Sequence, residues 1–497
     1  NPFATIQQGI NQASQSDTIS IGSGLFTDEI NIQSKSLTFS GVDTSSTIIS
    51  TNLILVESTN TNLVEFSNLK FLSNGTTQTM LGVDCFECPA EDTLELIFNA
   101  TSVDGRNDKR FLNGRRNVLI RVENSDFRNL NSTSDGGVFE LTGFDRNKSL
   151  TISNSKFINN GSSGQGGAIY ATYASLIRIT DSHFSNNFSS TTHPDEGGGA
   201  ICLKYSDTSI VRNSTFLDNQ SSGAGGAIHL IESDVNVDHC LFTGNAAEGE
   251  GQAIRLYAYS TCNVSFSTFG ANSTTPGSVS LQGGANLTLN NSILWGNPNF
   301  QIVVTNSSSA CSASVTYSNL TNGLLGIEDQ SGELILNWGE GNINLLPQFA
   351  SESDFSLHPN SPCIDAGDPD WDSDGTDWRY DTDDQDPDGS RFDLGAFYYD
   401  QTDSIAPAVS LNYPELSEEP NNGDTLDITW EASDNIGLDW AKLWFSSDAG
   451  QSFVLSDSID ANWGQVEWIV PDVISNSCKL AIWVSDLAGN VSADTLD

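Results

Sequence analysis

The chain has 497 residues, of which 64 are Asp or Glu and only 20 are Lys or Arg, giving a formal net charge of −44. Because nucleic acids are bound through clustered Lys and Arg, this balance disfavours a nucleic-acid partner, and it makes divalent cations the expected counterions. No apolar stretch approaches the roughly 18 residues that a transmembrane helix needs, which argues against a membrane-spanning segment.

The first residues predict a cap followed by a strand. Residues 3–10 have the apolar spacing of a short amphipathic helix, and residues 17–21 have the pattern of a first strand. A helix here would cover the end of a stack of strands, where backbone groups are otherwise unpaired. The chain begins at Asn1 without Met or a signal peptide, as we expect of a processed or truncated chain.

A repeat of roughly 25 to 32 residues follows, and it continues to about residue 326. Each copy contains a strand ending in Asn-Ser-x-Phe, with Asn three positions after the aromatic residue. The aromatic slot holds Phe127, Phe157, Phe184, Phe216, Phe242 and Phe269, continued by Leu294 and Leu320. The closing asparagines are Asn160, Asn187, Asn219, Asn245, Asn272 and Asn297.

A second signature, Gly-Gly-Ala-Ile, recurs with the same period. It begins at Gly166, Gly198 and Gly225, and in a degraded form at Gly251. We expect the glycines at a corner that needs a positive φ or close approach between neighbouring turns. We expect the closing asparagines at another corner, where they satisfy backbone groups and tolerate left-handed geometry.

Two ladders with one period indicate stacked rungs, so the predicted fold is all-β: a right-handed parallel β-helix (solenoid) followed by a small β-sandwich. Alternation in the strand that ends at Phe157 points Ser155 and Phe157 inward, and Asn154 and Lys156 outward. Cys240 occupies the slot of Ser155, which indicates a small buried residue and packing rather than thiol chemistry.

The repeat is expected to be interrupted near residues 75–120 by an irregular insertion. This stretch carries a basic cluster, Arg106, Lys109, Arg110, Arg115 and Arg116, which is either a binding patch or a solvated loop. It also carries Cys85 and Cys88, for which a small disulfide or free thiols are favoured over half of a metal site.

Outward slots of the strand that carries Gly-Gly-Ala-Ile are the candidates for catalysis. Rungs lie about 4.8 Å apart, so Lys204, His229, Arg255 and Tyr257 are expected to share a patch. A polysaccharide lyase needs a base, a group that neutralises a uronate carboxylate and a proton donor, and these residue types fit those roles. The alternative is structural, because outward positions of any solenoid carry mixed polar residues. No outward acidic pair of the kind that a glycoside hydrolase needs is evident on this strand.

The segment after the repeat ends in Asp393-Leu394-Gly395-Ala396-Phe397 and also contains Ser361-Pro362-Cys363-Ile364-Asp365. These residues resemble the closing segment of secreted bacterial β-helix proteins of the pectin-lyase-like superfamily with a choice-of-anchor-type terminal region. The two ladders resemble the repeats of polymorphic outer-membrane proteins. The resemblance covers about four fifths of the chain and implies a secreted, extracellular or cell-surface location. No outer-membrane barrel segment is evident, so the resemblance leaves the export route open.

An acidic run in the closing segment is the candidate metal site. Asp370, Asp372 and Asp374 alternate before Gly375, and Thr376 and Asp381 complete the spacing of a twelve-residue Ca²⁺ loop. Asp381 stands where such loops carry a bidentate Glu. The alternative is a solvated acidic linker. A second run, with Asp384, Asp386 and Asp388, lacks an acid at the twelfth position.

The predicted domains are the β-helix with its cap and closing segment over residues 1–400, and an immunoglobulin- or fibronectin-like sandwich over residues 403–497. Short apolar strands at 426–430, 441–445 and 480–484 support the sandwich.

Regularity favours a non-catalytic function, because an active site usually interrupts a repeat. We therefore expect an extracellular or cell-surface β-helix that acts in adhesion or as a structural surface component, with a polysaccharide or cell-surface ligand. The alternatives are a secreted polysaccharide lyase or glycoside hydrolase, and a self-assembling sheath or filament subunit. The sequence leaves enzymatic activity undecided, with Ca²⁺ as the expected cofactor.

Overall fold

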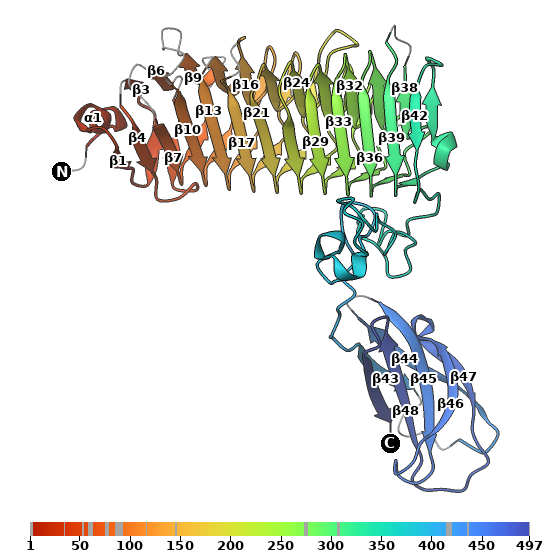
Figure 1. The fold of residues 1–497 in the computed structure, drawn as a ribbon. Helices are drawn as coiled ribbons and strands as arrows, with labels where there is room; N and C mark the ends of the chain where they lie inside the picture. Colours follow the sequence, from red (N-terminus) through yellow and green to blue (C-terminus); the bar gives the residue numbers. More distant parts are fainter. Residues whose placement is uncertain are drawn as a thin grey trace.

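The computed structural model describes residues 3–33, 35–51, 54–57, 63–74, 79–84, 93–115, 117–144, 147–272, 277–305, 309–413, 420–434 and 437–496. Figure 1 shows an elongated solenoid, a closing segment beside its later rungs, and a separate group of antiparallel strands. Cys85, Cys88 and Arg116 lie outside the described residues. No helix among the described residues is long and apolar enough to cross a membrane.

The predicted cap is confirmed. Helix α1 (Ile6–Gln12) begins after Thr5, whose side chain accepts a hydrogen bond from the Gln8 amide. Ile6 and Ile10 are buried against the first rung, so the helix covers the open end of the solenoid.

Three long parallel sheets form the walls of the solenoid. In the described residues, sheet A has 13 strands: β1 (Asp17–Ser20), β4 (Leu37–Ser40), β7 (Leu63–Ser67), β10 (Leu94–Asn99), β13 (Val118–Glu123), β17 (Ser149–Ser153), β21 (Leu176–Thr180), β25 (Ser209–Arg212), β29 (Asp234–Asp238), β33 (Thr261–Ser265), β36 (Asn286–Asn290), β39 (Ser312–Thr316) and β42 (Ile335–Trp338). Sheet B has 12 described strands: β2 (Gly24–Phe26), β5 (Thr47–Ile49), β8 (Lys70–Leu72), β11 (Ser102–Asp104), β14 (Asp126–Arg128), β18 (Lys156–Ile158), β22 (His183–Ser185), β26 (Thr215–Leu217), β30 (Leu241–Thr243), β34 (Thr268–Gly270), β37 (Ile293–Trp295) and β40 (Asn319–Leu320).

Sheet C carries the Gly-Gly-Ala-Ile signature, and the small sheet D leads into it. The 12 described strands of sheet C are β3 (Ile30–Gln33), β6 (Ile54–Glu57), β9 (Thr79–Asp84), β12 (Arg110–Arg115), β16 (Phe139–Thr142), β20 (Ile169–Thr172), β24 (Ile201–Lys204), β28 (Ile228–Ile231), β32 (Ile254–Tyr257), β35 (Val279–Gln282), β38 (Ile302–Val304) and β41 (Ile327–Asp329). Sheet D consists of β15 (Asn131–Ser132), β19 (Gly161–Ser162), β23 (Phe188–Ser189), β27 (Gln220–Ser221) and β31 (Ala246–Ala247). A full rung therefore runs from A through B and D to C, and then to A of the next rung.

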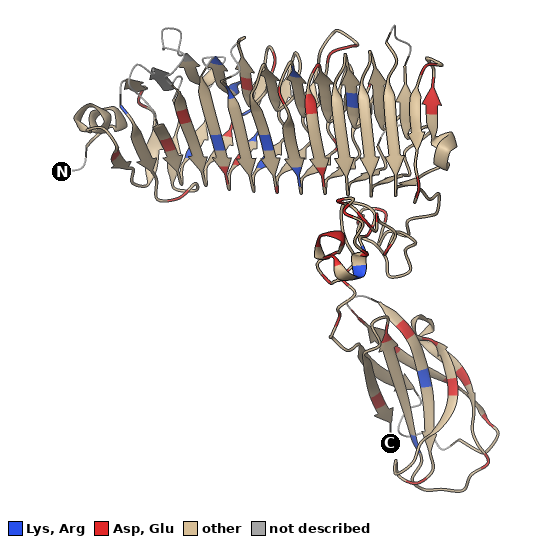
Figure 2. Cartoon of the chain, viewed as in Figure 1, with Lys and Arg blue, Asp and Glu red and all other residues tan. Residues whose placement is uncertain are grey.

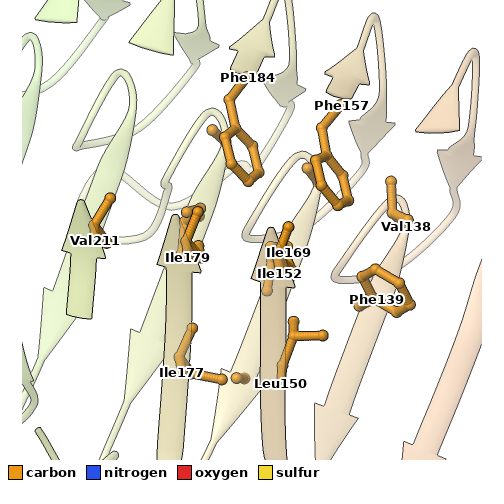
Figure 3. Close-up of a cluster of buried hydrophobic side chains, with 14 of the residues drawn as sticks. Val138, Phe139, Leu150, Ile152, Phe157, Ile169, Ile177, Ile179, Phe184 and Val211 are labelled. Carbon is orange, nitrogen blue, oxygen red and sulfur yellow. The ribbon is translucent and has the colours of Figure 1, made fainter. Parts of the chain in front are cut away.

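The interior holds the predicted aromatic ladder. Successive phenylalanines from Phe127 to Phe269 stack nearly parallel, with ring centroids 4.6 to 5.1 Å apart. Aliphatic side chains of sheets A and C surround the rings, and Figure 3 shows Phe157 and Phe184 above Ile152, Ile169 and Ile179. Each rung buries its apolar face only against its neighbours, so the core lengthens with every repeat.

The closing asparagines form a buried hydrogen-bond ladder. Asn160 donates from its backbone to Oδ1 of Asn187 at 3.1 Å and from Nδ2 to the Phe127 carbonyl at 3.0 Å. The pattern repeats to Asn297, so these side chains satisfy backbone groups as predicted. The left-handed residue at this corner is the one before, such as Asn159 with φ 55°, and not the closing Asn itself.

The serine slot forms a second ladder. Ser155 donates from its backbone to Oγ of Ser182 at 3.2 Å, and Ser182 does the same to Ser214 at 3.1 Å. Cys240 is fully buried in this row, where its Sγ takes the place of a hydroxyl and contacts the Asp238 carbonyl at 3.3 Å. Packing, as predicted for Cys240, is confirmed.

Both predicted reasons for the glycine pair are found. Gly166 has φ 65°, in the left-handed region, and a Cβ added to Gly167 would lie 2.0 Å from the carbonyl oxygen of Gly199. The first glycine therefore makes the turn, and the second allows the next rung to approach.

Two sequence expectations about the extent of the solenoid are wrong. The described residues 79–84, 93–115 and 117–120 do not interrupt it, because they supply strands β9 to β13 in register with their neighbours. Lys109 and Arg110 of the basic cluster are buried rather than solvated. The rungs also pass residue 326, since β42 pairs in parallel with β39.

The closing segment, residues 341–400, packs against the corner between sheets A and B. The Asp368 amide donates to Oδ1 of Asn291 at 2.7 Å, and the Ala396 amide donates to Oγ1 of Thr268 at 2.9 Å. Ile293 shares a small buried cluster with Leu394 and other residues of the segment. Short 3-10 helices η2 (Trp378–Tyr380) and η3 (Thr382–Asp384) lie in its acidic part, and η1 (Gly323–Gly326) lies in the last rungs.

The C-terminal residues form two antiparallel sheets that fit a small β-sandwich. One sheet has the order β43 (Ala408–Tyr413), β44 (Thr425–Ser433) and β47 (Gln465–Ile469); the other has β46 (Val454–Asp460), β45 (Leu438–Ser446), β48 (Lys479–Asp486) and β49 (Val491–Leu496). Helix η4 (Ala461–Trp463) lies between β46 and β47. Trp430 and Trp468 are buried in the core between the sheets.

Candidate functional sites

The predicted catalytic residues lie on the outward side of sheet C. Strand register places Glu140, Tyr170, Cys202, His229, Arg255 and Ser280 in one row, which we call the outward row. Lys204, Ile231 and Tyr257 form the neighbouring row, two residues further along each strand.

The outward row is not open to solvent at the predicted site. His229 is 0% exposed, Arg255 2% and Cys202 0%. Segments between sheets D and C contact two of them: Cys202 contacts Oε1 of Gln165 at 3.5 Å, and Arg255 forms an ion pair with Glu250. The expectation of a shared outward patch is therefore wrong for His229 and Arg255, because both side chains are buried.

The surroundings of His229 do not suit a catalytic base. Burial, together with the charges of Arg255 and Lys204, lowers the pKa of His229 to about 3. Neither ring nitrogen has a hydrogen-bond partner among the described residues. A general base must reach the proton that it removes, and this imidazole is enclosed.

Lys204 and Tyr257 remain partly exposed at the rim of sheet C. Ile231 separates them in the register, so their backbones lie about two rung spacings, roughly 9.6 Å, apart. The structure thus splits the four candidates into a buried pair and a partly exposed pair.

An acidic pair that sequence reasoning missed lies on the same face. Glu140 forms an ion pair with Arg110 and accepts a hydrogen bond from Asn113 at 2.7 Å. Burial raises the pKa values of Asp135 and Glu140; the charge of Glu196 also raises the pKa of Asp135, and the charge of Asp135 also raises that of Glu140. Residues 136–140 are a degraded copy of the glycine signature, and that copy is the signal that could have located Glu140.

Aromatic side chains line the corner between sheets C and A. Phe144, 85% exposed, contacts Tyr173 at 5.5 Å between centroids, and Tyr173 stacks on Tyr205 at 4.9 Å. Tyr259, 66% exposed, lies further along the same corner. We call these four residues the aromatic edge.

Three residues of the aromatic edge have unfavourable backbone geometry. Tyr173, Tyr205 and Tyr259 have φ between 51° and 59°, a region that bulky residues rarely adopt. Asn occupies left-handed positions at the corner between sheets A and B, for example Asn154 and Asn213. Glu232 and Ala258 have the same left-handed geometry at this corner, so the turn imposes the conformation and the tyrosines are accommodated in it.

The corner between sheets A and B shows what such rings can do. Where the closing segment packs, this corner carries Phe266 and Tyr317, which also have positive φ. Phe266 contacts Trp371 and Phe392, and Arg391 lies over the ring of Tyr317. Left-handed aromatic residues therefore serve as docking points within this molecule.

The predicted Ca²⁺ loop divides into two groups. Carboxylate oxygens of Asp370, Asp372 and Asp384 lie within 4.8 Å of one another, and so do those of Asp372, Asp374 and Asp381. The first group includes Asp384, which was assigned to the second acidic run. The second group is the more exposed, and a hydrogen bond with Asp383 raises the pKa of Asp381 to about 6.

Thr376 is exposed and donates its backbone N–H to Asp374 at 2.6 Å. Three further carboxylates, of Asp403, Asp434 and Asp486, lie within the same distance of one another where the sandwich begins.

A match to a family model supports the solenoid. A family model described as "Right handed beta helix region" matches residues 99–269 and 143–321. The catalytic unit of a GH87 alpha-1,3-glucanase from Streptomyces thermodiastaticus strain HF3-3 is 12% identical, with a TM-score of 0.36, and the match covers 68% of this chain and 65% of that one. A GH87 alpha-1,3-glucanase catalytic domain in complex with tetrasaccharides is also 12% identical, with a TM-score of 0.34, and the match covers 68% of this chain and 67% of that one. No curated protein matches the sequence.

Proposed function

We propose that this chain is an extracellular, cell-surface β-helix protein that binds an uncharged polysaccharide along its aromatic edge, without cleaving it. It would act in adhesion or as a structural surface component, and the sandwich would link the solenoid to a neighbour or an anchor. The aromatic edge carries this proposal.

Ring presentation supports a glycan as the ligand. Aromatic rings provide large, rigid apolar faces on which a sugar ring can pack, and the hydroxyl group of tyrosine can form hydrogen bonds with the hydroxyl groups of a sugar. Tyr173 and Tyr205 follow one another at the rung spacing, so an extended chain laid along the solenoid would meet repeated contacts. Within the same molecule, Phe266 and Tyr317 show this kind of ring in use as a docking point.

Charge favours an uncharged glycan over a uronate polymer. The formal net charge is −44, and Figure 2 shows acidic residues on the solenoid, the closing segment and the sandwich. A polyanion would be repelled over most of this surface. The burial of His229 and Arg255 also weakens the case for a lyase on sheet C.

Binding of the intact chain to immobilised neutral glucans, mannans and xylans tests the proposal. Tyr205→Asn removes the ring but keeps a residue that accepts a positive φ, so backbone effects are small. We expect about tenfold weaker binding for this variant and for Phe144→Ala. Trp463→Ala, at a 67% exposed ring of the sandwich, is the matched control and should bind as the parent does.

Glycoside hydrolysis is the second candidate, and the acidic pair Asp135 and Glu140 favours it. Burial raises the pKa of both carboxyl groups, a raised pKa suits a general acid, and glycoside hydrolases use two carboxyl groups beside the bond that they cleave. Release of reducing ends that Asp135→Asn and Glu140→Gln abolish, and that Tyr205→Asn leaves intact, would replace the binding proposal with this one. Unsaturated product that disappears in Lys204→Ala would indicate a lyase instead.

A further inference from the structure

The acidic part of the closing segment contains a carboxylate group of unusual burial. Asp384 is 0% exposed, although it belongs to an acidic run on the surface of the segment. Its Oδ1 accepts a hydrogen bond from the Trp371 amide at 2.7 Å. Its Oδ2 is buried and has no hydrogen-bond partner among the described residues.

The neighbours of Asp384 increase the electrostatic strain. Asp370 and Asp372 each bring a carboxylate oxygen within 4.8 Å of it. Burial and the repulsion from Asp372 and Asp370 raise the pKa of Asp384. None of the ion pairs found in the described residues involves these three carboxylates. A buried carboxylate without a compensating charge destabilises a fold by several kcal/mol.

The donor set identifies the ion that would relieve this strain. All three side chains offer oxygen, and no His or Cys belongs to the group. Hard divalent cations prefer carboxylate oxygen, and Ca²⁺ accepts about six to eight oxygen ligands in flexible geometry, including water and backbone carbonyls. The partly exposed Asp370 and the exposed Asp372 leave room for water on the outer side.

We propose that Asp370, Asp372 and Asp384 bind one Ca²⁺ ion that fastens the closing segment to the solenoid. Trp371 lies between two of the ligands in sequence, and its amide is held by the third. Its indole packs edge-on against Phe266, with 5.2 Å between centroids. The ion would therefore fix the loop that carries this contact. The site shares Asp370 and Asp372 with the predicted loop. It differs because its third carboxylate is that of Asp384, and Asp374 and Asp381 take no part.

Titration of the chelator-treated full chain with CaCl₂, followed by calorimetry and thermal unfolding, tests the proposal. We expect saturable binding and a higher unfolding midpoint with Ca²⁺. Asp384→Asn keeps an acceptor for the Trp371 amide and should weaken Ca²⁺ binding by about tenfold or more. Without Ca²⁺ this variant should be at least as stable as the parent, because the buried repulsion is relieved.

Asp381→Asn is the matched control within the same loop. It should bind Ca²⁺ as the parent does. Loss of binding in Asp381→Asn with retention in Asp384→Asn would place the ion among Asp372, Asp374 and Asp381 and overturn the proposal. Absence of binding to the parent at millimolar Ca²⁺ would also overturn it.

Terbium luminescence gives a second reading, since Trp371 lies next to the ligands and should sensitise a bound Tb³⁺ ion. Trp371→Phe should remove the luminescence and leave the heat of Ca²⁺ binding. Luminescence unchanged in both Trp371→Phe and Asp384→Asn would exclude this site.

Discussion

Trp371 of the closing segment packs edge-on against Phe266 of the solenoid, with 5.2 Å between the ring centroids. Phe266 is 5% exposed, has φ 43° and also contacts Phe392. One left-handed corner residue therefore contacts two aromatic rings of the closing segment.

Phe266→Asn should release the closing segment without unfolding the solenoid. Asn accepts a positive φ, so the variant removes the ring contacts and little else. Loss of a buried phenylalanine costs about 3 kcal/mol. We expect limited proteolysis to cut within residues 341–400 of the variant, while its far-ultraviolet circular dichroism stays that of the parent. Equal protease resistance of variant and parent would show that the ring contact is dispensable.

Asn219→Asp should strongly destabilise the solenoid. The Nδ2 of Asn219 donates to the Phe184 carbonyl at 3.0 Å and to Oδ1 of Asn245 at 3.0 Å, and a carboxylate cannot donate. Leaving these buried acceptors unpaired and burying a charge costs about 3 kcal/mol or more. Asn159→Asp is the control, because it loses only an exposed hydrogen bond to Oδ1 of Asn129, and it should change the free energy of unfolding by about 1 kcal/mol or less. Denaturant unfolding measures both.

His229→Leu should stabilise the protein and reduce its acid sensitivity. The ring nitrogens lack partners among the described residues, so an apolar side chain of similar volume should gain about 1–2 kcal/mol at pH 7. The folded pKa of His229 is lowered to about 3. Folding therefore requires the neutral imidazole. The protein has its full stability above the ordinary pKa of His229, about 6.5, and loses stability as the pH falls towards 3.

Guanidinium unfolding measures the free energy of unfolding at pH 7 and at pH 4. The difference between the two values should be smaller for His229→Leu than for the parent. His193→Leu, at an exposed position, should leave the parent difference unchanged. A lower stability of His229→Leu at pH 7 would indicate that the imidazole has a partner in solution.

Asp393 should make the closing segment more stable in mild acid than at pH 8. Its oxygens accept from the amides of Asp365 and Tyr399, each at 2.7 Å. Burial, with repulsion from Asp386 and Asp365, raises its pKa to about 8. A raised folded pKa means that the contribution is complete below the ordinary pKa and is lost as the pH rises through 8.

The midpoint of thermal unfolding of the parent should fall by a few degrees between pH 5 and pH 8, and Asp393→Asn should remove most of this fall. Asp448→Asn is the control, because hydrogen bonds from serines lower the pKa of Asp448 to about 2 and it does not titrate in this range. Equal slopes for the parent and Asp393→Asn would contradict the prediction.

Much of the fold could be predicted because its contacts repeat. Phe157, Asn160 and Ser155 each contact the equivalent residue one rung away, so one period in the sequence encodes both the core and the corners. The β-strands of the sandwich could also be located from alternation and turn residues. Register between rungs places His229 beside Arg255, and the sequence predicted this neighbourhood correctly.

The candidate sites were predicted less well, since they depend on contacts without a period. The turns that lead into sheet C differ in length and composition from rung to rung, and alternation within a strand says nothing about what covers its outer side. The carboxylates of Asp384 and Asp370 lie close together because the loop between them folds back, and no motif spacing in the sequence indicates this.

The sequence alone determined the solenoid, its ladders and the presence of an acidic closing segment, because neighbouring rungs interact at one fixed offset. The tertiary structure decided which outward residues are enclosed, which carboxylates converge and where the closing segment packs. Asp368 meets Asn291 across 77 residues and Ala396 meets Thr268 across 128, and no repeat specifies such pairs. They form because the corner offers rings and unpaired polar groups, a property of the assembled surface rather than of any single rung.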